Sequence, residues 1–338
     1  MARRDAGGAC AGAVARGDPG AAQCGAQRRA AVRRLRIRRR PRKGRVMQDF
    51  KGRTAFVTGG ASGIGFAMAK AFGAAGMNVM LADIEREPLE KAVEDLRQRQ
   101  VRVEGVHCDV AERRSVEDAA KATIEAFGKV HVVCNNAGVG AGGPVGTLKP
   151  GDWDWTIAVN LMGVVYGTEA FLPHIRAHGE GGHFVNTASM AGMISPPGME
   201  PYFATKFAVV AMSEGWAGQL APENIGVSVL CPGFVRTRIF ESSRTRQDKF
   251  GKAEAPASAE PSAGQKLVQA GIDPDVVGAC VFEAVRDNDL YIFTHPDMRP
   301  AVEQRFERIM QGFDKASRRG ALSGVDPKSP QQINMLNN

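Results

Sequence analysis

Apolar residues recur along the chain in two alternating patterns. Short apolar runs, typical of buried parallel strands, are each followed by a stretch with an apolar residue every three or four positions, typical of a helix. The expected strands are 53–58, 78–82, 101–107, 130–134, 183–188, 226–231 and 290–293. The expected helices are 64–75, 88–100, 113–127, 152–177, 202–221, 274–286 and 299–313. This alternation predicts an α/β fold with a doubly wound parallel sheet, which binds ligands at the carboxyl ends of its strands.

Three stretches lie outside this alternation. Residues 1–46 contain 13 Arg and one Lys against two Asp, with few large apolar residues, so we expect a disordered basic tail. Such a tail is typical of a nucleic-acid arm, a transit peptide or a tether to an anionic surface, or results from a start site upstream of Met47. The polar stretch 238–272 predicts a lid or a solvated insertion, and 314–338 a flexible C-terminal tail. We expect residues 47–313 to form one domain.

Composition narrows the class of protein. The 338 residues are 43% hydrophobic, and no apolar run approaches the ~20 residues of a membrane-spanning helix, so no membrane contact is expected. The tail contributes +12 to the net charge of +8, which leaves about −4 for residues 47–338, so no nucleic-acid contact is expected there. The six cysteines lack metal-ligand spacing, which favours a reducing, cytoplasmic location, with Cys108, Cys134 and Cys231 buried.

A glycine-rich turn follows the first expected strand. Between that strand and the next helix stand Gly59, Ser62, Gly63, Ile64 and Gly65, in the arrangement of a dinucleotide pyrophosphate site. Glycines let the main chain turn sharply and approach the phosphates, while the N–H groups of the helix N-terminus bind them. A glycine cluster by itself is weak evidence, but the strand and the helix that this mechanism requires are both present.

Polar residues stand at the ends of the following strands. Asp83 lies about 20 residues beyond the glycine turn, where a carboxylate binds the adenosine ribose hydroxyls and repels a 2′-phosphate, so NAD is favoured over NADP. Alternatively, Asp83 is the N-cap of the helix that follows. Asp109 and Val110 are placed to contact the adenine, and Asn136 and Gly138 follow the fourth strand.

Tyr202 and Lys206 are candidates for proton transfer. They are four residues apart, so a helix places both on one face. Free tyrosine has a pKa near ~10, and a neighbouring cation lowers it by roughly 1–3 units, which brings the phenol toward use as a base at neutral pH. A positively charged nicotinamide would add to that shift. The alternative is that Tyr202 and Lys206 are ordinary residues of an amphipathic helix without a catalytic role.

Asn160 stands in an apolar stretch, where a buried amide needs hydrogen-bond partners.

These motifs together resemble the short-chain dehydrogenase/reductase family. The residues that carry the resemblance keep the family's order over about 50–293, and they are Thr58-Gly59-x-x-x-Gly63-Ile64-Gly65, Asn135-Asn136-Ala137-Gly138, Asn160, Ser189, Tyr202-x-x-x-Lys206 and Pro232-Gly233. The resemblance implies a single Rossmann-type domain with a seven-stranded parallel sheet, commonly a homotetramer. The cofactor contacts that we assign from it are Gly59, Ser62, Gly63, Ile64, Gly65, Asp83, Asp109, Val110, Asn136, Ala137, Gly138, Tyr202, Lys206, Pro232, Gly233, Val235 and Thr237.

The same resemblance implies a catalytic role for four residues. Tyr202 would be the general acid/base on the substrate oxygen, and Lys206 would lower its pKa and bind the nicotinamide ribose. Ser189 would hydrogen-bond the substrate oxygen, and Asn160 would hold a water molecule in the proton relay to Lys206. Hydride would pass to the cofactor while a proton leaves through the phenolate, and no metal is implied.

A narrower resemblance links the chain to the bacterial Cα-dehydrogenases of lignin-derived β-aryl ethers. It rests on the long helix before Ser189, the expected lid and residues 289–296, whereas 135–137 and 196–199 depart from that subgroup. It implies NAD-dependent oxidation of a bulky benzylic alcohol. The residues that we expect to line an apolar substrate pocket, unless they are core fillers, are Met190, Met193, Met199, Phe234 and Phe240.

We therefore expect an NAD-dependent dehydrogenase of hydrophobic secondary alcohols that forms a homo-oligomer, either a tetramer or a dimer. One alternative is an NADPH-dependent ketoreductase, such as a 3-oxoacyl-carrier reductase. Another is a nucleic-acid-binding or cofactor-sensing protein that uses the fold as a scaffold. The second alternative does not require Asn160, Ser189, Tyr202 and Lys206 together, and their joint presence favours the enzyme.

Overall fold

A computed structural model of the chain describes residues 47, 49–252 and 260–323. The expected basic tail, and most of the expected C-terminal tail, lie outside these residues. So does the central part of the expected lid, residues 253–259.

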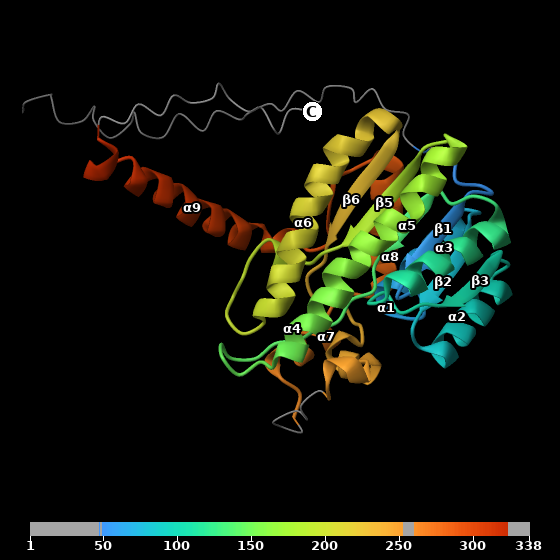
Figure 1. The fold of residues 1–338 in the computed structure, drawn as a ribbon, viewed down its shortest axis with the longest axis horizontal. Coiled ribbons are helices and arrows are strands. Elements are labelled where there is room, and N and C mark those ends of the chain that lie inside the picture. Colours follow the sequence, from blue (N-terminus) through green and yellow to red (C-terminus); the bar gives the residue numbers. More distant parts are fainter. Residues whose placement is uncertain (1–46, 48, 253–259, 324–338) are drawn as a thin grey trace, which may run out of the picture. The chain divides into compact units, whose positions relative to one another are not determined.

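One parallel sheet of seven strands organises the described part of the chain, in the order β3-β2-β1-β4-β5-β6-β7 (Figure 1). Its strands are β1 (Thr54–Thr58), β2 (Asn78–Asp83), β3 (Val103–His107), β4 (Val132–Asn135), β5 (Gly182–Thr187), β6 (Ile225–Cys231) and β7 (Tyr291–Phe293). The strand order reverses between β1 and β4, which creates the switch point where doubly wound folds bind ligands. The predicted fold class and all seven predicted strands are confirmed.

Helices cover both faces of the sheet (Figure 1). They are α1 (Gly63–Ala74), α2 (Arg86–Gln98), α3 (Arg113–Phe127), α4 (Pro150–Ile157), α5 (Gly163–His178), α6 (Glu200–Leu220), α7 (Ala263–Gln269), α8 (Pro274–Asp287) and α9 (Arg299–Ala316). One core joins the sheet to α1, α2 and α8, and a second joins it to α3 and α5. β1 contributes side chains to both cores, because Ala55 and Val57 belong to the first and Phe56 to the second. A strand buried on both faces reads as an unbroken apolar run, which is why the pattern was visible in the sequence.

The long helix expected at 152–177 is not continuous, and this prediction is wrong in detail. The helix begins two residues earlier, at Pro150, and α4 and α5 are joined by a π-helical turn at Ala158–Met162. Turns of this kind are often found at functional sites. The turn carries Asn160, which the sequence had singled out for its apolar surroundings.

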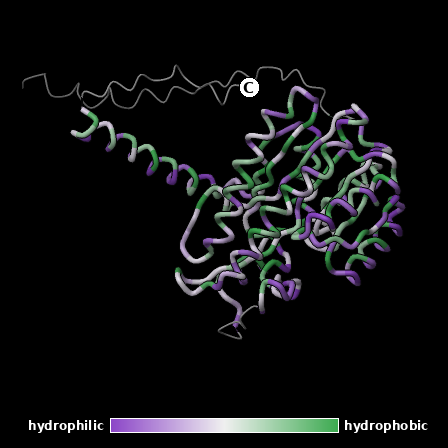
Figure 2. Tube along the Cα trace, viewed as in Figure 1, coloured by the Kyte–Doolittle hydropathy of each residue, from purple (hydrophilic) through white to green (hydrophobic). Residues whose placement is uncertain are grey.

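Two further predictions can be compared with the described residues, the burial of three cysteines and the end of the last helix. Cys108, Cys134 and Cys231 are buried, as predicted. The last helix continues to Ala316, three residues beyond its predicted end, and the alternation of apolar and polar residues along it is visible in Figure 2. The described parts of the expected lid form two short 3₁₀ segments, Ile239–Thr245 and Asp248–Phe250, and helix α7. Whether this region opens and closes stays a prediction.

Candidate active site

A cavity of about 890 Å³ lies at the carboxyl ends of the strands, across the switch point. Its lining brings together most of the residues that the sequence singled out, from the glycine turn after β1 to the loop after β6. Of the predicted catalytic and cofactor-binding residues, Gly65 and Asn160 do not line it. The predicted site is therefore one contiguous cleft.

The glycine turn supplies a close main-chain surface. Gly59 and Gly63 have positive φ values of 61° and 55°, which side chains rarely tolerate. A Cβ atom on Gly65 would lie 2.1 Å from the carbonyl oxygen of Gly59, so α1 can approach the turn only because Gly65 has no side chain. The N-cap residue Ser62 makes no side-chain capping bond, and no acidic residue stands in the first turn of α1. The N–H groups at this end therefore suit an anionic ligand such as a pyrophosphate.

Thr58 holds the end of β4 against the glycine turn. Its hydroxyl oxygen accepts hydrogen bonds from the main-chain N–H groups of Asn136 (2.9 Å) and Ala137 (3.0 Å) and donates to the carbonyl of Cys134 (3.3 Å). The Asn136 amide donates to the Thr58 carbonyl at 3.0 Å. Sequence reasoning placed Thr58 in the motif without a role, and its position directly before the first glycine was the available signal.

Asp83 ends β2 and lines the cleft. One carboxylate oxygen accepts a hydrogen bond from the N–H of Ala61 and the other from the N–H of Glu85, both at 3.0 Å. Burial raises the pKa of Asp83, and these two main-chain bonds oppose that effect. The N-cap of α2 is Glu85 rather than Asp83, so Asp83 does not act as the cap of this helix. Its carboxylate instead links the glycine turn to the end of β2.

Tyr202 and Lys206 occupy successive turns at the start of α6, on the cleft side, as predicted. Ser189, two residues after β5, lines the cavity with Tyr202 and lies near enough for its hydroxyl to lower the pKa of the Tyr202 phenol. The Ser189 hydroxyl is itself fixed, because it accepts from the N–H of Ala191 (3.1 Å) and donates to the carbonyl of Pro232 (3.3 Å). The serine and the tyrosine thus present adjacent oxygens to the cleft, which suits binding of one substrate oxygen.

The electrostatics of this pair differ from the prediction. Burial raises the pKa of Tyr202, with the Ser189 hydroxyl opposing, and burial lowers the pKa of Lys206 to about 8. The expected lowering of the Tyr202 pKa by Lys206 is therefore wrong for the protein by itself. The reason is geometric: the Lys206 ammonium lies 5.5 Å from the centre of the Tyr202 ring and donates to the carbonyl of Thr187 at 2.8 Å. Desolvation outweighs a cation at that position.

Asn160 is fully buried and braces the site from behind. Its side-chain oxygen accepts from the N–H of Val139 (2.7 Å), and its amide donates to the Val139 carbonyl (2.9 Å) and to the Thr205 hydroxyl (3.4 Å). A Cβ atom on Gly138 would lie 3.4 Å from the Asn160 oxygen and 3.5 Å from the Lys206 nitrogen, so the loop after β4 passes between the two. The Asn160 side chain is occupied by these bonds, and its predicted role in a water relay stays a prediction.

His295 supports the loop that follows β6, and sequence reasoning missed it. Its Nδ1 atom accepts from the N–H of Gly233 at 3.1 Å, and its Nε2 atom lies 3.1 Å from the carbonyl of Phe234. A Cβ atom on Gly233 would lie 2.7 Å from the imidazole ring, which explains the glycine. The two residues are 62 positions apart, so no local pattern connects them.

Two polar atoms in the cavity wall have no hydrogen-bond partner among the described residues. The indole nitrogen of Trp155 and the side-chain oxygen of Gln247 are buried, and both residues line the cavity. Unsatisfied buried polar atoms are costly, and both atoms are enclosed by protein rather than open to the cavity. The glycine turn is the part of the lining that fits a dinucleotide, because the free N–H groups at the helix N-terminus suit its pyrophosphate.

Much of the remaining lining of the cavity is apolar. The side chains that line it include Ile194, Pro196, Pro197, Met199, Phe203, Phe240, Leu267 and Met298. Of the pocket residues predicted from the sequence, Met190, Phe234, Met199 and Phe240 line the cavity. Met193 does not, because it packs against the core between α6 and β6, and that prediction is wrong.

A separate cluster lies outside this cleft. Ligand atoms of His131, His178 and Glu180 lie within 4.8 Å of one another. In His131 one ring nitrogen accepts from the N–H of Thr54 and the other faces Glu180. In His178 the two nitrogens contact the carbonyl of Val130 and the N–H of Glu180. A metal ion would have to displace these bonds, so the geometry describes a hydrogen-bond network.

Comparison with known proteins places this architecture among dehydrogenases. The profile of the short chain dehydrogenase family matches residues 53–248. The C alpha-dehydrogenase of Sphingobium sp. is 36% identical over 266 residues, which cover 78% of this chain and 87% of that protein. The CLA biosynthesis dehydrogenase/reductase of Lactiplantibacillus plantarum is 34% identical over 273 residues, with 78% and 95% covered.

Solved structures show the same likeness. A short chain dehydrogenase/reductase from Burkholderia phymatum in complex with NAD superimposes with a TM-score of 0.73 at 38% identity, covering 79% of this chain and 97% of the other. LigD of Sphingobium sp. in its apo form superimposes with a TM-score of 0.66 at 32% identity, covering 78% and 98%.

Proposed function

We propose that this chain, which belongs to the short-chain dehydrogenase family, is an NAD-dependent dehydrogenase that oxidises a bulky hydrophobic secondary alcohol to a ketone. That it is an alcohol dehydrogenase or reductase of the family's type follows from its homologues. The observation that carries the finer proposal is that Ser189, Tyr202 and Lys206 line one cleft together with the glycine turn and a set of apolar side chains.

Each catalytic residue has a separate task. The Ser189 hydroxyl, fixed by Ala191 and Pro232, orients the substrate oxygen beside Tyr202. The Tyr202 phenolate takes the hydroxyl proton of the alcohol, acting as general base. The Lys206 ammonium, held by the Thr187 carbonyl, supplies positive charge behind the phenol. A bound oxidised nicotinamide supplies the hydride acceptor and a further positive charge next to the phenol.

Asp83 and Glu85 support NAD rather than NADP. The Asp83 carboxylate lines the cleft at the end of β2, where the second ribose of the dinucleotide would lie, and its negative charge opposes a 2′-phosphate. Arg244 also lines the cleft, but Glu85 pairs with it through two hydrogen bonds of 2.9 and 2.7 Å. That pairing neutralises a cation that a 2′-phosphate would need.

The apolar part of the cavity supports a bulky substrate. Proline, methionine and phenylalanine side chains line it, and they suit an aromatic or aliphatic body rather than a charged one. The similar C alpha-dehydrogenase makes benzylic alcohols carried by aryl ethers the first class to test. A 3-oxoacyl-[acyl-carrier-protein] reductase from Thermotoga maritima is also similar, at 32% identity over 217 residues. Reduction of a ketone is therefore the alternative reaction to test.

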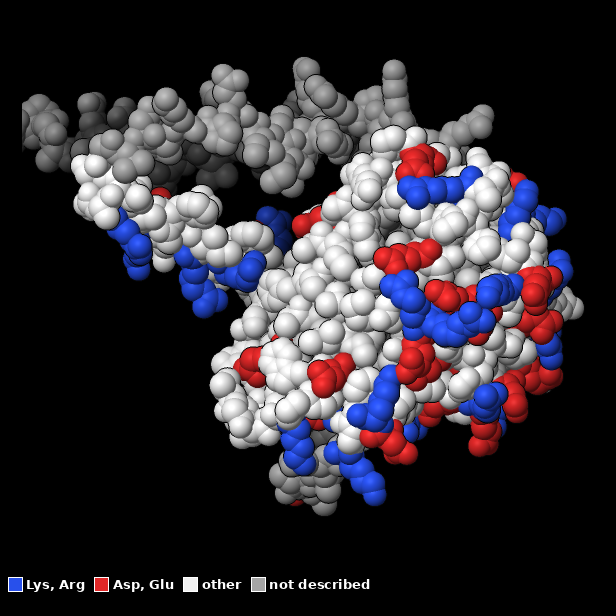
Figure 3. Space-filling model, in the orientation of Figure 1, with Lys and Arg blue, Asp and Glu red and all other residues white. Residues whose placement is uncertain are grey.

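We also propose a homo-oligomer, a tetramer or a dimer, located in the cytoplasm. The outer surface over α6 carries few charges (Figure 3), and the glycines at 215 and 218 on this helix face open space. One described helical run, 150–178, is by length and composition apolar enough to cross a membrane, but core helices pass the same test and half of this one is buried. The sparsely charged surface over α6 suits contact with a second copy of the chain.

The test is a matched set of initial rates. The protein is assayed with NAD⁺ and NADP⁺ against secondary alcohols of benzylic, steroid and aliphatic types, and with NADPH against 3-oxoacyl thioesters. We expect the highest kcat/KM with NAD⁺ and a benzylic alcohol. The Tyr202→Phe variant should lose nearly all of this activity. A higher kcat/KM for NADPH-dependent reduction would refute the proposed direction and the interpretation of Asp83.

A further inference from the structure

One peptide group in the loop after β6 is bonded at both of its polar ends. The carbonyl of Pro232 accepts a hydrogen bond from the Ser189 hydroxyl at 3.3 Å and another from the main-chain N–H of Met190 at 2.9 Å. The N–H of Gly233, at the other end of the same peptide group, donates to Nδ1 of His295 at 3.1 Å. Because a peptide group is planar and rigid, it links the position of His295 to that of the turn that carries Ser189.

The partners of His295 determine which of its ring nitrogens carries the proton. A main-chain N–H only donates, so Nδ1 is unprotonated and accepts from Gly233. A carbonyl only accepts, so Nε2, which lies 3.1 Å from the carbonyl of Phe234, carries the proton and donates. The neutral imidazole ring therefore spans two successive residues of the loop, with an acceptor for the first and a donor for the second.

The two bonds of the ring differ in what else supports the loop. The carbonyl of Phe234 also accepts from the N–H of Ile272 at 3.1 Å, so this point of the loop has a second anchor. For the N–H of Gly233, the acceptor that the described residues supply is His295. Gly233 also packs closely on the ring, because a Cβ atom on it would lie 2.7 Å from Cγ of His295. The bond to Gly233 is therefore the one on which the orientation of the peptide group depends.

His295 itself stands outside the cleft. Ser189, Pro232 and Gly233 line the cavity, whereas His295 does not. An effect of His295 on the reaction therefore has to pass through the loop.

We propose that His295 is a positioning residue for catalysis, because its Nδ1 atom holds the Pro232–Gly233 peptide group in the orientation in which the Pro232 carbonyl fixes the Ser189 hydroxyl. Without that acceptor the peptide group is free to rotate, and the carbonyl turns away from Ser189. A less well fixed Ser189 oxygen orients the substrate less well, which lowers kcat more than it raises KM. This inference rests on the proposed function and adds a residue from outside the cleft to the same reaction.

Three substitutions of His295 separate the two bonds of the ring. An asparagine places its amide oxygen near the position of Nδ1, a glutamine places its amide nitrogen near that of Nε2, and an alanine removes both groups. We expect His295→Ala to lower kcat about tenfold, the effect of one hydrogen bond, with a smaller change in KM for the alcohol. His295→Asn should restore most of the rate, and His295→Gln should not, because only asparagine keeps an acceptor for Gly233.

Hydrogen exchange supplies a readout that needs no substrate. Mass spectrometry with fragmentation resolves the amide of Gly233, which should exchange slowly in the wild type and in His295→Asn and fast in His295→Ala and His295→Gln. Equal exchange in the wild type and in His295→Ala would overturn the inference, whatever the rates of turnover.

A double variant tests whether the effect passes through Ser189. In a Ser189→Ala background, the further change His295→Ala should lower the residual kcat by about twofold at most, because the group that His295 positions is already absent. A further loss of about tenfold in that background would show that His295 acts by another route and would overturn the inference.

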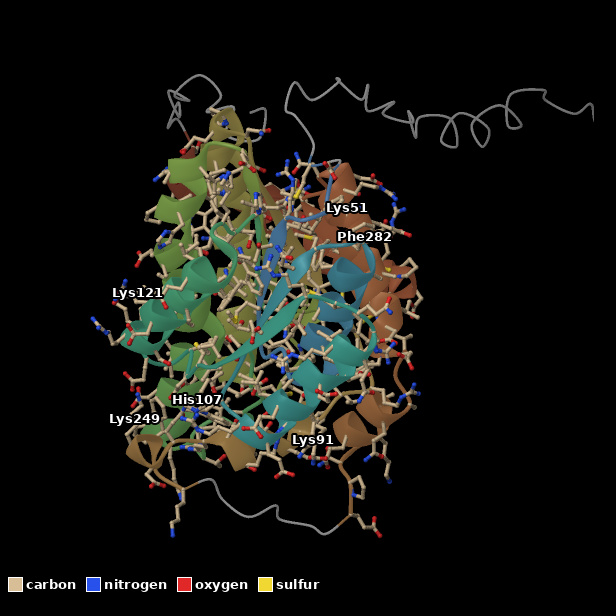
Figure 4. All side chains as sticks on the ribbon, turned by 90° about the vertical axis from the view of Figure 1, so that its right-hand side faces the viewer. Lys51, Lys91, His107, Lys121, Lys249 and Phe282 are labelled. Carbon is tan, nitrogen blue, oxygen red and sulfur yellow. The ribbon has the colours of Figure 1, made fainter. Side chains whose placement is uncertain are left out.

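The matched control is His107→Ala, because this histidine also stands at the carboxyl end of an edge strand. It is the exposed last residue of β3, at the opposite edge of the sheet from β7, and it does not line the cavity (Figure 4). The control should keep the wild-type kcat and the wild-type exchange at Gly233.

The remaining outcomes separate this inference from the proposed function. An unchanged kcat in His295→Ala, or equal rates in the Asn and Gln variants, would overturn the inference and leave the proposed function intact. If the alanine variant does not fold by circular dichroism, the Asn and Gln variants decide by themselves. A wild type that oxidises none of the alcohols would refute the proposed function and this inference together.

Discussion

The two ends of the cleft are stabilised by different interactions. At the catalytic end, the Lys206 side chain is buried and its ammonium donates to a main-chain carbonyl, that of Thr187. At the adenosine end, the segment 239–250, which we call the strap, is held by pairs of opposite charge, among them Arg244 with Glu85 and Lys249 with Glu112. The catalytic end thus keeps a charge that is held by a neutral acceptor, whereas the charges of the strap cancel in pairs.

This difference has an energetic consequence. A buried charge without a counter-ion costs several kcal/mol, and the lowered pKa of Lys206 is the expression of that cost. The charge is therefore available to stabilise negative charge on the Tyr202 oxygen when a proton is removed. Exposed ion pairs contribute about 0–1 kcal/mol each, so the pair of Lys249 with Glu112 is weak, whereas the pair of Arg246 with Asp152 is largely buried, with side chains 4% and 19% exposed. On the outer surface, charged residues gather over α2 and α3 and are sparse over α6 (Figure 3).

The largest effect is expected at the catalytic end. Tyr202→Phe removes the proton acceptor without changing the ring, so kcat should fall by about 10³-fold or more while NADH affinity changes little. Steady-state rates and fluorescence titration measure the two quantities. Tyr166→Phe is the control, because Tyr166 lies under the guanidinium of Arg113 and not in the cavity wall. Residual kcat within tenfold of the wild type would show that another group carries the proton.

The buried ammonium predicts a pH dependence of stability. The pKa of Lys206 is about 8 in the folded protein and near ~10.4 in an unfolded chain, so between these values the unfolded chain binds more protons. The burial cost is therefore full below pH 8 and is relieved as the pH rises toward 10. The free energy of unfolding of the wild type, relative to Lys206→Met, should increase by about 2 kcal/mol from pH 7.5 to 9.5.

Denaturant unfolding at the two pH values measures this difference, and subtraction of the variant removes contributions from other titrating groups. A difference that stays constant between the two pH values would show that the folded and unfolded pKa values of Lys206 are the same. The contrast between the two ends would then lose its energetic basis.

Asp83 lies at the adenosine end, where its carboxylate would meet the ribose, and its effect should be smaller than that of Tyr202. Asp83→Ala removes the charge that opposes a 2′-phosphate and the acceptor for the ribose hydroxyls. The KM for NAD⁺ should rise, and the preference for NAD⁺ over NADP⁺ in kcat/KM should fall by about tenfold. Glu85→Gln, which leaves Asp83 in place and releases Arg244, tests whether the neighbouring pair adds to this preference. An unchanged cofactor ratio in Asp83→Ala would reduce Asp83 to a structural link between Ala61 and Glu85.

Sequence reasoning found the parts of the site that local pattern encodes. Gly59 and Asp83 stand at strand ends, Gly63 begins α1, and the spacing of Tyr202 and Lys206 is a helical turn, so short-range geometry sufficed to place them. The positions of the strands and of the helices between them likewise follow from periodicity.

Tertiary effects escaped that reasoning. Whether the pKa of Tyr202 is raised or lowered depends on its burial, which no local sequence pattern gives. The Asn160 side chain bonds to the loop after β4, 21 positions away, and the bond between Arg244 and Glu85 joins residues 159 positions apart. The expectation of a polar lid at 238–272 identified the region of the strap but not its contacts. The missed features therefore lie where distant segments meet.

The smallest effect is expected at the strap. Arg244→Gln breaks a pair whose side chains are 28% and 23% exposed, so the dissociation constant of NADH should rise by about two- to fivefold at low salt. At high salt the wild type and the variant should converge, because screening weakens the pair that only the wild type has. The control Arg286→Gln breaks a similar pair with Asp287 on α8 and should leave NADH binding unchanged at every salt concentration.

The double variant Glu85→Gln/Arg244→Gln separates the strap from simple charge effects. If the single variant weakens binding only because Glu85 becomes an unpaired anion near the cofactor, the double variant should bind NADH as the wild type does. If the pair matters because it holds the strap over the adenosine end, both variants should bind equally weakly. Wild-type affinity in Arg244→Gln at low salt would show that the strap does not contribute to cofactor binding, and only the catalytic half of the comparison would stand.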